Sequence, residues 1–491
     1  NRHFIPVKVD RELNPALDNR LIDFVERTQG QAGWPLNVFV TPDGYPLVGM
    51  IYQPAENFQQ ILERIAQEWQ SDKARLKELA QRTTDQLSTR SPVKRDVNAR
   101  QLREAFLNAS LQLADEFEGG FGNQNKFPSV PQLDALLTLY QQDSTSSLGD
   151  FLRLTLEAMA EGGLRDHLSG GFFRYVVDPG WQVPHFEKML YDNALLASLY
   201  LRAARVLEEP QFQHVGLQTL EFMRHEFRLD NGGMLASFSA LDDQGIEGGY
   251  YLWQMSEFKP LLNEQMFEVA TRIWAVEGPP ELEHGHHLRQ VSGLEDVAAE
   301  LQQPVEQIEK ALARARDKLL ERRDQRTLPR DNKQISAWNG LALSAFVAGA
   351  QQDSELKQTS TELRNFIIEQ LWDGKQLKRA SGGQQQLGQV GLEDYAYVAQ
   401  GLLDYARDQN DEATLNVAND IIRQAWQRFF DPEGWLLQQQ PLLQYAARQP
   451  LLADGPMPSP AVILMQATRQ LLRQRPDAEL ERSLRLAQGL R

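Results

Sequence analysis

The chain has 491 residues, of which 42% are hydrophobic and 24% charged, as in ordinary globular proteins. Its formal net charge of −16 argues against nucleic acids and anionic membrane surfaces as main partners, because both are negatively charged. It contains no cysteine, which excludes disulfides, thiolate metal sites and thiol redox chemistry in this chain. No run of about 18 apolar residues is present, and no signal peptide is visible. We therefore expect a cytoplasmic protein without a membrane span.

The first 72 residues have the pattern of an α/β domain. Residues 4–10 (FIPVKVD) predict a short buried strand, and the next residues predict a helix over 15–28. Pro35 leads into a second strand, and the TPDG turn (41–44) leads into a third. An amphipathic helix follows over 58–69. This β-α-β-β-α order corresponds to the last part of a thioredoxin fold, in which Pro35 takes the position of the cis-proline.

From residue 99 onwards, apolar residues recur at helical spacing between polar loops. We expect helices over residues 99–117, 131–141, 148–161, 187–207, 210–227, 255–269, 295–322, 336–351, 356–371, 391–408, 412–429, 457–473 and 476–490. Paired helices of this length predict a solenoid that closes into an α/α toroid. Residues 232–253 predict two short strands around a turn, and the segment after Asp373 predicts another hairpin.

The loops between these helices share a composition of glycine, charged and aromatic residues. They cover residues 119–128, 162–175, 232–253, 328–342, 391–403 and 454–464. In a closed ring such loops meet at one end and line one site. Trp34, Trp181, Trp253 and Trp338 lie in loops or at helix starts, and aromatic rings beside carboxylates, Arg and Asn are typical of a carbohydrate pocket. The alternative is that these tryptophans are apolar plugs that pack the loops onto the ring.

The stretch from Gly162 to Leu199 holds the densest set of residues suited to catalysis. His167 and His185 are candidates for general acid–base work, because a histidine pKa lies near neutrality. The alternative for each is a structural histidine bonded to a backbone carbonyl. A carboxylate pair for glycoside hydrolysis is the other chemistry considered, with candidates Asp166, Asp178, Asp192, Asp242, Glu247, Asp331 and Asp394. The histidines between His284 and His287 lack the spacing of a metal site, and we expect an exposed loop there.

Several of these motifs occur together in one known family. They are KVDRE (8–12), AGWPLNVFVTPDG (32–44), GGFG (119–122), DHLSGGFFRYVVDPGWQVPHFEKMLYDNA (166–194), EGGYYLW (247–253) and WNGLA (338–342). In these motifs the chain resembles the thioredoxin-domain-containing family that includes spermatogenesis-associated protein 20 and its bacterial relatives. The resemblance implies a thioredoxin-like domain followed by an (α/α)6 barrel of the six-hairpin glycosidase type, similar to N-acylglucosamine 2-epimerases and cellobiose epimerases.

The family usually carries a Cys-His-Trp-Cys motif upstream of KVDRE, whereas this chain begins at Asn1, after that point. We therefore interpret it as N-terminally truncated. The predicted fold is mainly α: an (α/α)6 toroid with a truncated α/β thioredoxin-like domain. Residues 1–72 are expected to form the partial thioredoxin-like domain, residues 73–98 a linker or helix, and residues 99–491 the barrel.

The leading hypothesis for function is a carbohydrate-active enzyme, either a sugar epimerase or isomerase or a glycoside hydrolase, with its site at the mouth of the barrel. His167, His185, Asp166 and Glu187 are the predicted catalytic residues. The predicted substrate-binding residues are Arg174, Trp181, Lys188, Tyr191, Asp192, Asn193, Asp242, Glu247, Tyr250, Asp331, Trp338, Asn339, Asp394 and Tyr395. We expect a sugar ligand, no cofactor and no metal. The alternative is a non-catalytic scaffold for a protein partner, or a redox-associated protein whose thiol motif is missing here.

Overall fold

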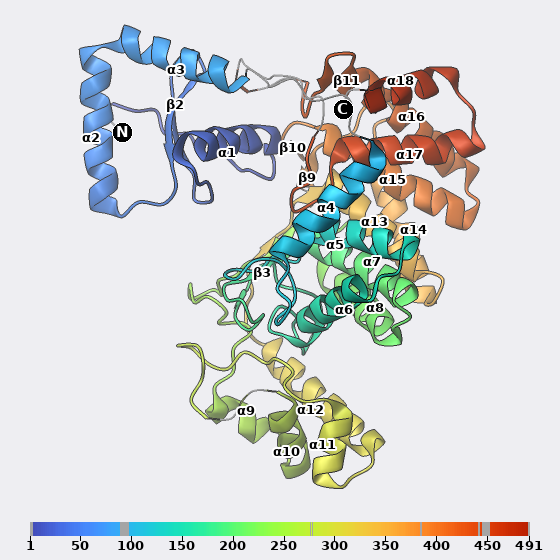
Figure 1. Cartoon of the computed structure of the whole chain (residues 1–491). Helices are drawn as coiled ribbons and strands as arrows, with labels where there is room; N and C mark the ends of the chain where they lie inside the picture. The colour runs from blue at the N-terminus through green and yellow to red at the C-terminus, as the bar shows by residue number, and fades with distance from the viewer. Residues whose placement is uncertain are drawn as a thin grey trace.

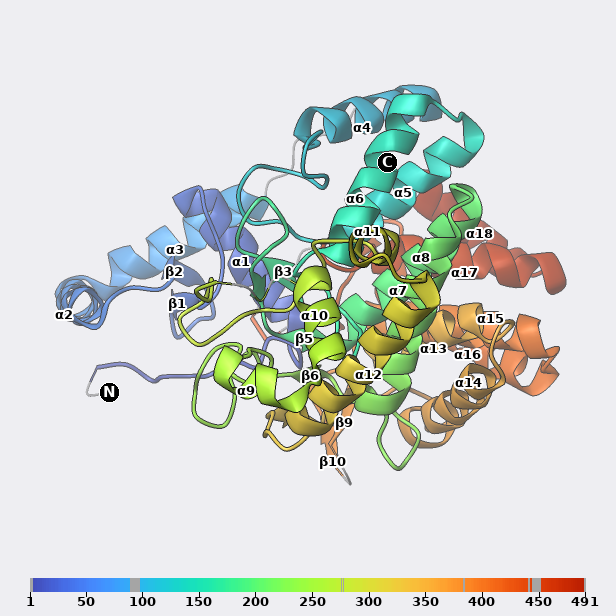
Figure 2. The same cartoon turned by 90° about the horizontal axis from the view of Figure 1, so that it is seen from below.

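The computed structural model describes residues 3–88, 98–274, 276, 278–382, 385–439, 442–443 and 452–489. The elements of its N-terminal part are α1 (Pro15–Gln29), β1 (Asn37–Val40), β2 (Pro46–Met50), α2 (Ala55–Ser71) and α3 (Lys73–Ser88). The two strands pair antiparallel across the predicted TPDG turn, in which the Gly44 N–H donates to the Thr41 carbonyl. The Trp34–Pro35 peptide bond is cis, as the position of Pro35 predicts. In Figures 1 and 2, α1 lies beside the rest of the molecule and α2 lies on the far side.

The prediction of a buried strand over residues 4–10 is wrong. Within the described residues this segment pairs with no strand, and its apolar side chains face solvent, with Ile5 90% and Val7 77% exposed. Phe4 packs edge-on against Phe39, with ring centroids 5.4 Å apart. The apolar pattern favours a strand, but a strand is stable only when a neighbour satisfies its backbone hydrogen bonds. The predicted linker 73–98 begins as helix α3, and its residues 89–97 lie outside the described part.

The larger part of the chain is a ring of inner and outer helices (Figure 1). Within the described residues the inner helices contact one another in the order α5 (Val130–Gln142), α7 (Leu190–Val206), α13 (Ser336–Gly349), α15 (Leu392–Gln409) and α17 (Pro460–Gln474). The outer helices that follow and pack on them are α6 (Ser146–Glu161), α8 (Pro210–Phe222), α14 (Ser354–Phe366), α16 (Glu412–Phe429) and α18 (Ala478–Gly489), and α4 (Ala99–Leu113) precedes α5. This is the α/α toroid that the helical periodicity predicts, with most helix bounds within three or four residues of those expected.

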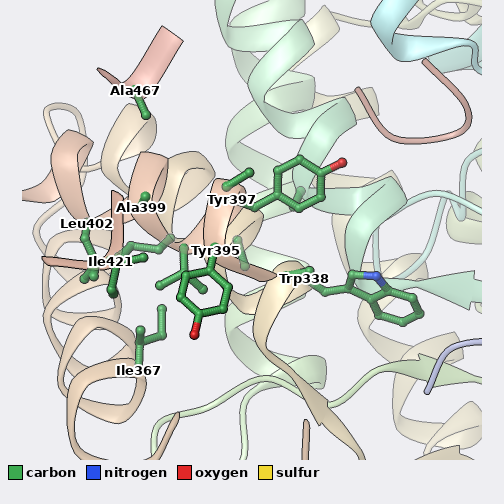
Figure 3. Packing of buried hydrophobic residues seen from close by; sticks show 14 of the residues in the cluster. Trp338, Ile367, Tyr395, Tyr397, Ala399, Leu402, Ile421 and Ala467 are labelled. Carbon is green, nitrogen blue, oxygen red and sulfur yellow. The ribbon is translucent and has the colours of Figure 1, made fainter. Parts of the chain in front are cut away.

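The main apolar core lies between these helices. Figure 3 shows part of it, with Ile367, Leu402 and Ile421 gathered on one side and the ring of Trp338 pointing away from them. The inner helices α13 and α15 pack closely because they meet at glycines. A Cβ on Gly340 would lie 2.6 Å from backbone atoms of α15, and one on Gly401 would lie 2.5 Å from the Gly340 carbonyl oxygen. Neither position therefore accommodates a side chain without movement of the backbone.

The first turns of α7 and α13 are built alike. Asn193 and Asn339 are each the fourth residue of their helix, and each accepts a bond from a loop N–H and donates to two carbonyls. The backbone partners are Phe172 and Met189 for Asn193, and Met234 and Ile335 for Asn339. These bonds fix each helix start to the loop of the preceding hairpin. As a result, the third residues of the two helices, Asp192 and Trp338, occupy equivalent places.

An insertion between α8 and α13 forms a small lobe, at the bottom of Figure 1. Its helices are α9 (Met255–Leu261), α10 (Glu264–Ile273), α11 (Leu294–Leu301) and α12 (Val305–Arg323), which share a core of their own. Two of the predicted helices, 255–269 and 295–322, are each divided in two. Asn263 begins α10 as a side-chain cap that accepts from the Met266 N–H, and Gln302 ends α11 in the left-handed region, at φ 51°.

Short strands tie the loops together at one end of the ring. They are β3 (Tyr175–Val176), β4 (Pro184–His185), β5 (Lys188–Met189), β6 (Ser237–Phe238), β7 (Arg330–Asp331), β8 (Gln334–Ile335), β9 (Ala380–Gly382), β10 (Gln385–Leu387), β11 (Phe430–Asp431) and β12 (Gly434–Trp435). Three-stranded ladders β5–β6–β7 and β8–β9–β10 join the segments that lead into α7, α13 and α15. The ladders therefore bring the predicted loops 232–253 and 328–342 together with the segment that leads into α7. The predicted hairpin in 232–253 is reduced to β6 and a bridge between Leu241 and Glu247.

Candidate functional site

The candidate site lies where the first turns of α7 and α13 meet these ladders, and we call this end of the ring the mouth. Asp192 and Trp338 are 7% and 3% exposed, and each has a buried polar atom without a hydrogen-bond partner in the described structure, Oδ2 of Asp192 and Nε1 of Trp338. Tyr191 links the two helices, because its ring packs against the indole of Trp338 at 4.9 Å between centroids. Unsatisfied buried polar atoms are costly and uncommon. Other side-chain atoms of the described residues share this property, and these two, on equivalent positions of neighbouring helices, make Asp192 and Trp338 candidates for contact with a ligand.

The Asp192 carboxyl is held in its neutral form. Burial raises the pKa of Asp192 to about 8, although the charge of Arg174 lowers it. A charged group loses its hydration when it is buried, so the protonated form is favoured. At neutral pH the carboxyl therefore carries a proton that it can donate, which is the property of a general acid.

Beside this carboxyl stands a chain of charged and aromatic groups. Nδ1 of His185 lies 2.7 Å from Oε1 of Glu247, and the imidazole stacks on Tyr175 at 5.1 Å. Nε2 of His185 lies 4.0 Å from Oε2 of Glu187, which accepts a 2.8 Å bond from Nη1 of Arg174. The His185 side chain is 29% exposed. These groups come from β3, β4 and the loops beside them, and the charges of Arg174 and Glu187 act on the buried Asp192.

The N-terminal part reaches the same mouth through residues 10–14. Nζ of Lys333 lies 2.5 Å from a carboxylate oxygen of Asp10 and 3.2 Å from one of Glu12. Nε of Arg379 donates to the Glu12 carbonyl at 2.9 Å. Arg11 follows in this segment and lies close enough for its charge to lower the pKa values of Tyr191 and Asp192, which burial raises.

Asp166 and Lys188 lie in a separate, buried ion cluster. Asp166 accepts from Nζ of Lys188 at 2.8 Å and from Nη1 of Arg323 at 3.0 Å. Arg323 is the last residue of α12, so the cluster joins the inserted lobe to the ring. Lys188 is also surrounded by the rings of Phe173, Phe222 and Tyr251. Burial lowers the pKa of Lys188 to about 8, opposed by the charge of Asp166. These contacts fit a role in holding the fold together.

The environment of His167 differs from that of His185. Its Nε2 lies 3.0 Å from the Gly162 carbonyl, and burial lowers the pKa of His167 to about 4. His287 has the same arrangement with the Gly163 carbonyl at 2.8 Å, and burial lowers its pKa to about 4 as well. Both rings are therefore neutral donors to backbone, which is the structural alternative that the sequence left open for His167.

The other predicted site residues are held by contacts with the protein. Trp181 is buried and donates to the Glu118 carbonyl, Asp242 caps a turn, and Tyr250 lies under Arg323. Asp331 forms an ion pair with Lys333, and Asp394 forms one with Arg379. The Tyr395 hydroxyl accepts from the Leu377 N–H. Asn193 and Asn339 bond backbone, as described above. The structure thus brings Arg174, His185, Glu187, Tyr191, Asp192, Glu247 and Trp338 together at the mouth and places the remainder around it.

Sequence reasoning missed four cations that organise the region, Arg11, Arg323, Lys333 and Arg379. Arg11 lies within the KVDRE motif, and its place in that charged motif could have marked it as a site residue. The part of the chain that the structure describes shows no group of three or more His, Asp or Glu side chains placed to hold a metal. No helix in the same residues combines the length and the apolarity that a membrane crossing requires.

The chain is similar to a family model, to two kinds of curated protein and to solved structures. The family model Thioredox_DsbH, described as a protein of unknown function (DUF255), matches residues 1–88. The uncharacterised protein B0495.5 of Caenorhabditis elegans is 29% identical, with 96% of this chain and 70% of that protein covered. Spermatogenesis-associated protein 20 of Mus musculus is 32% identical, with 88% of this chain covered. The chain spans 62% of the length of that mouse protein.

Among solved structures, D-mannose isomerase superposes with a TM-score of 0.50 at 11% identity, covering 82% of this chain and 87% of the isomerase. The helical part therefore has the fold of that (α/α)6 toroid, which confirms the predicted fold class. The resemblance inferred from the KVDRE, VPHFEKMLYDNA and WNGLA motifs is confirmed as well, because spermatogenesis-associated protein 20 of Mus musculus matches this chain at 32% identity.

Proposed function

We propose that this chain is a carbohydrate-active enzyme of the sugar epimerase or isomerase type, with the sugar held at the mouth of the ring. The observation that carries the proposal is the pair of buried, unpartnered polar atoms, Oδ2 of Asp192 and Nε1 of Trp338, beside the His185–Glu247 pair. The first is an acid that is protonated at neutral pH, and the second is a donor on an aromatic ring. A sugar carbonyl or hydroxyl supplies the acceptors that both require.

The proposed chemistry is proton transfer next to a sugar carbonyl. A carboxylate can only accept, so the proton of the His185–Glu247 bond resides on Nδ1, and Nε2 is left as the base. His185 would remove the proton from the carbon beside the carbonyl. Asp192 would donate its proton to the carbonyl oxygen and so stabilise the negative charge that develops there. Return of the proton from His185 to the former carbonyl carbon, with loss of the hydroxyl proton at the neighbouring carbon, gives an isomer. Protonation of the original carbon from its opposite face gives an epimer.

The surrounding residues would position these two groups. Glu187 accepts from Arg174 at 2.8 Å and holds that guanidinium beside Asp192. Tyr175 fixes the plane of the His185 imidazole by stacking, and Tyr191 packs against the Trp338 ring and so holds its Nε1 in place. The shared fold with D-mannose isomerase supports a sugar-converting ring of helices, while the residues named here are this chain's own.

A glycoside hydrolase is the second candidate, favoured by one specific observation. Asp192 is neutral, whereas Glu187 accepts an ion-pair bond from Arg174, so two carboxyl groups of different environment share the mouth. Hydrolysis of a glycosidic bond uses such a pair, one as acid and one as base or nucleophile. The product distinguishes the two functions, because hydrolysis releases a new reducing end and proton transfer does not.

The test is incubation of the protein with simple aldoses, ketoses and disaccharides in D2O, followed by proton NMR. The proposal predicts deuterium at the carbon beside the carbonyl and formation of an epimer or isomer. His185→Ala and Asp192→Asn are expected to stop exchange while sugar still binds. Asp150→Asn, on the exposed face of α6, is the matched control and is expected to exchange as the wild type does.

Two results would replace the proposal. Release of a reducing end without deuterium incorporation would assign the hydrolase function. Absence of exchange, cleavage and sugar binding across the panel, together with a stably bound protein after purification, would assign the ring to a non-catalytic scaffold.

A further inference from the structure

The segment of residues 10–14 is fixed against the mouth from both sides. Lys333 lies between Asp10, Glu12 and Asp331, and Arg379 donates to the Glu12 backbone while it also pairs with the buried Asp394. Lys333 immediately precedes β8, and Arg379 immediately precedes β9. These contacts place residues 10–14 over the ladder that leads into α13 and α15. The N-terminal part is therefore attached to the ring at the site itself.

Arg11 packs on an aromatic ring and not against a carboxylate. Its guanidinium lies 4.4 Å above the Trp34 ring, and within the described residues no Asp or Glu comes within ion-pair distance of it. By contrast, Arg174, Lys333 and Arg379 each form ion pairs. Trp34 is anchored by an Nε1 bond of 3.1 Å to Asp18 and is 52% exposed. A ligand can therefore bind the Arg11 guanidinium with a polar group and pack an apolar face against the exposed Trp34 ring.

Two carboxyl groups lie near Arg11. Asp192 is protonated at neutral pH, so it presents no negative charge to the guanidinium. Burial raises the pKa of Asp18 and the charge of Arg11 lowers it, but Oδ1 of Asp18 accepts its bond from Nε1 of Trp34. An unpaired guanidinium that is partly removed from water gains when an anion binds, because guanidinium groups bond carboxylate and phosphate through two parallel N–H donors. The exposed indole can pack against the apolar face of a sugar ring.

We propose that the N-terminal part completes the sugar site, and that Arg11 with Trp34 binds the acidic group of an anionic sugar, a carboxylate or a phosphate. This inference rests on the proposed function at the same mouth and adds the class of substrate. In this arrangement the sugar carbonyl faces Asp192 and Trp338, and the acidic group lies farther out, against the N-terminal part. Arg11 is then a specificity-determining residue, and the thioredoxin-like part serves as one wall of the site.

The experiment measures binding of three related probes, glucose, glucuronate and glucose 6-phosphate, by isothermal titration calorimetry at low and high salt. The proposal predicts that one or both acidic sugars bind at least about 10-fold more tightly than glucose at low salt, and that the preference shrinks as salt screens it. Arg11→Gln is expected to abolish the preference, so that the acidic sugars bind no more tightly than glucose does. Arg64→Gln, at an exposed position of α2, is the matched control and is expected to keep it.

The outcomes separate this inference from the function on which it rests. Comparison of glucuronate with glucose 6-phosphate identifies the acidic group. Equal binding of neutral and acidic sugars, or a preference that survives Arg11→Gln, overturns the role of Arg11 while the proposed function stands. If no probe binds and no sugar shows exchange, the proposed function falls, and this inference falls with it. An unchanged thermal midpoint of Arg11→Gln confirms that the variant is folded.

Discussion

Replacing Asp192 by asparagine changes stability with a predictable dependence on pH. An unfolded aspartate has a pKa of about 3.9, whereas burial raises the pKa of Asp192 in the folded chain to about 8. Between these two values the unfolded chain is ionised at this position and the folded chain is not, so folding takes up one proton. The free energy of unfolding therefore falls by about 1.4 kcal/mol per pH unit across the window. Its accumulated loss by pH 8 is on the order of 5 kcal/mol.

Asparagine has a similar shape and no such titration, so Asp192→Asn avoids this loss. The difference in unfolding free energy between the variant and the wild type should grow in the variant's favour from pH 5 to pH 8. Urea unfolding of both proteins at pH 5, 6, 7 and 8, followed by tryptophan fluorescence, measures that difference, in which all other titrating groups cancel. A difference that does not change with pH would show that the folded carboxyl is ionised, and it would refute the assignment of Asp192 as an acid.

Three further predictions concern the mouth, the buried ion cluster and the helix contacts. His185→Ala should lower the turnover rate at least about 100-fold and leave the dissociation constant of the sugar nearly unchanged. A loss of affinity as large as the loss of turnover would contradict the role of His185 as the base. Asp166→Ala should lower the unfolding free energy by about 3–5 kcal/mol because it leaves the buried Lys188 and Arg323 without the carboxylate that they share; the exposed Asp150→Ala is the control, and equal stability of the two variants would remove the structural role. Gly340→Ala should cost about 1–3 kcal/mol through overpacking against α15, whereas Gly455→Ala, which meets open space, should be neutral in the same urea titration.

Much of the architecture follows from local pattern. Apolar spacing predicts the helices of the ring because the inner helices α7, α13 and α15 are buried on nearly all sides. The outer helix α16 is buried on one face. The loops with glycine and charged residues marked the end of the ring where they meet. The strand predicted over residues 4–10 is wrong because pairing depends on a neighbouring strand. The side-chain pattern of the segment is that of a strand, but a local pattern does not reveal whether a neighbour is present.

The sequence indicated which residues lie at the candidate site, but it did not indicate what each side chain contacts there. Asp192 and Trp338 were both expected to bind substrate, but their unpartnered atoms depend on burial that no spacing discloses. Asn193 and Asn339 belong to the same motifs, yet one position further along the helix turns the side chain towards backbone. The cations were missed because their partners are remote in sequence, since Arg379 meets Glu12 across 367 residues and Arg323 meets Asp166 across 157.

The most direct test of the account is a crystal structure of the protein with a sugar identified in the NMR panel. We predict density for the sugar at the mouth, with an oxygen within hydrogen-bond distance of both Asp192 Oδ2 and Trp338 Nε1, and with His185 beside the carbon next to the carbonyl. A bound sugar on another face of the ring, with both of these atoms still unpartnered, would contradict the account.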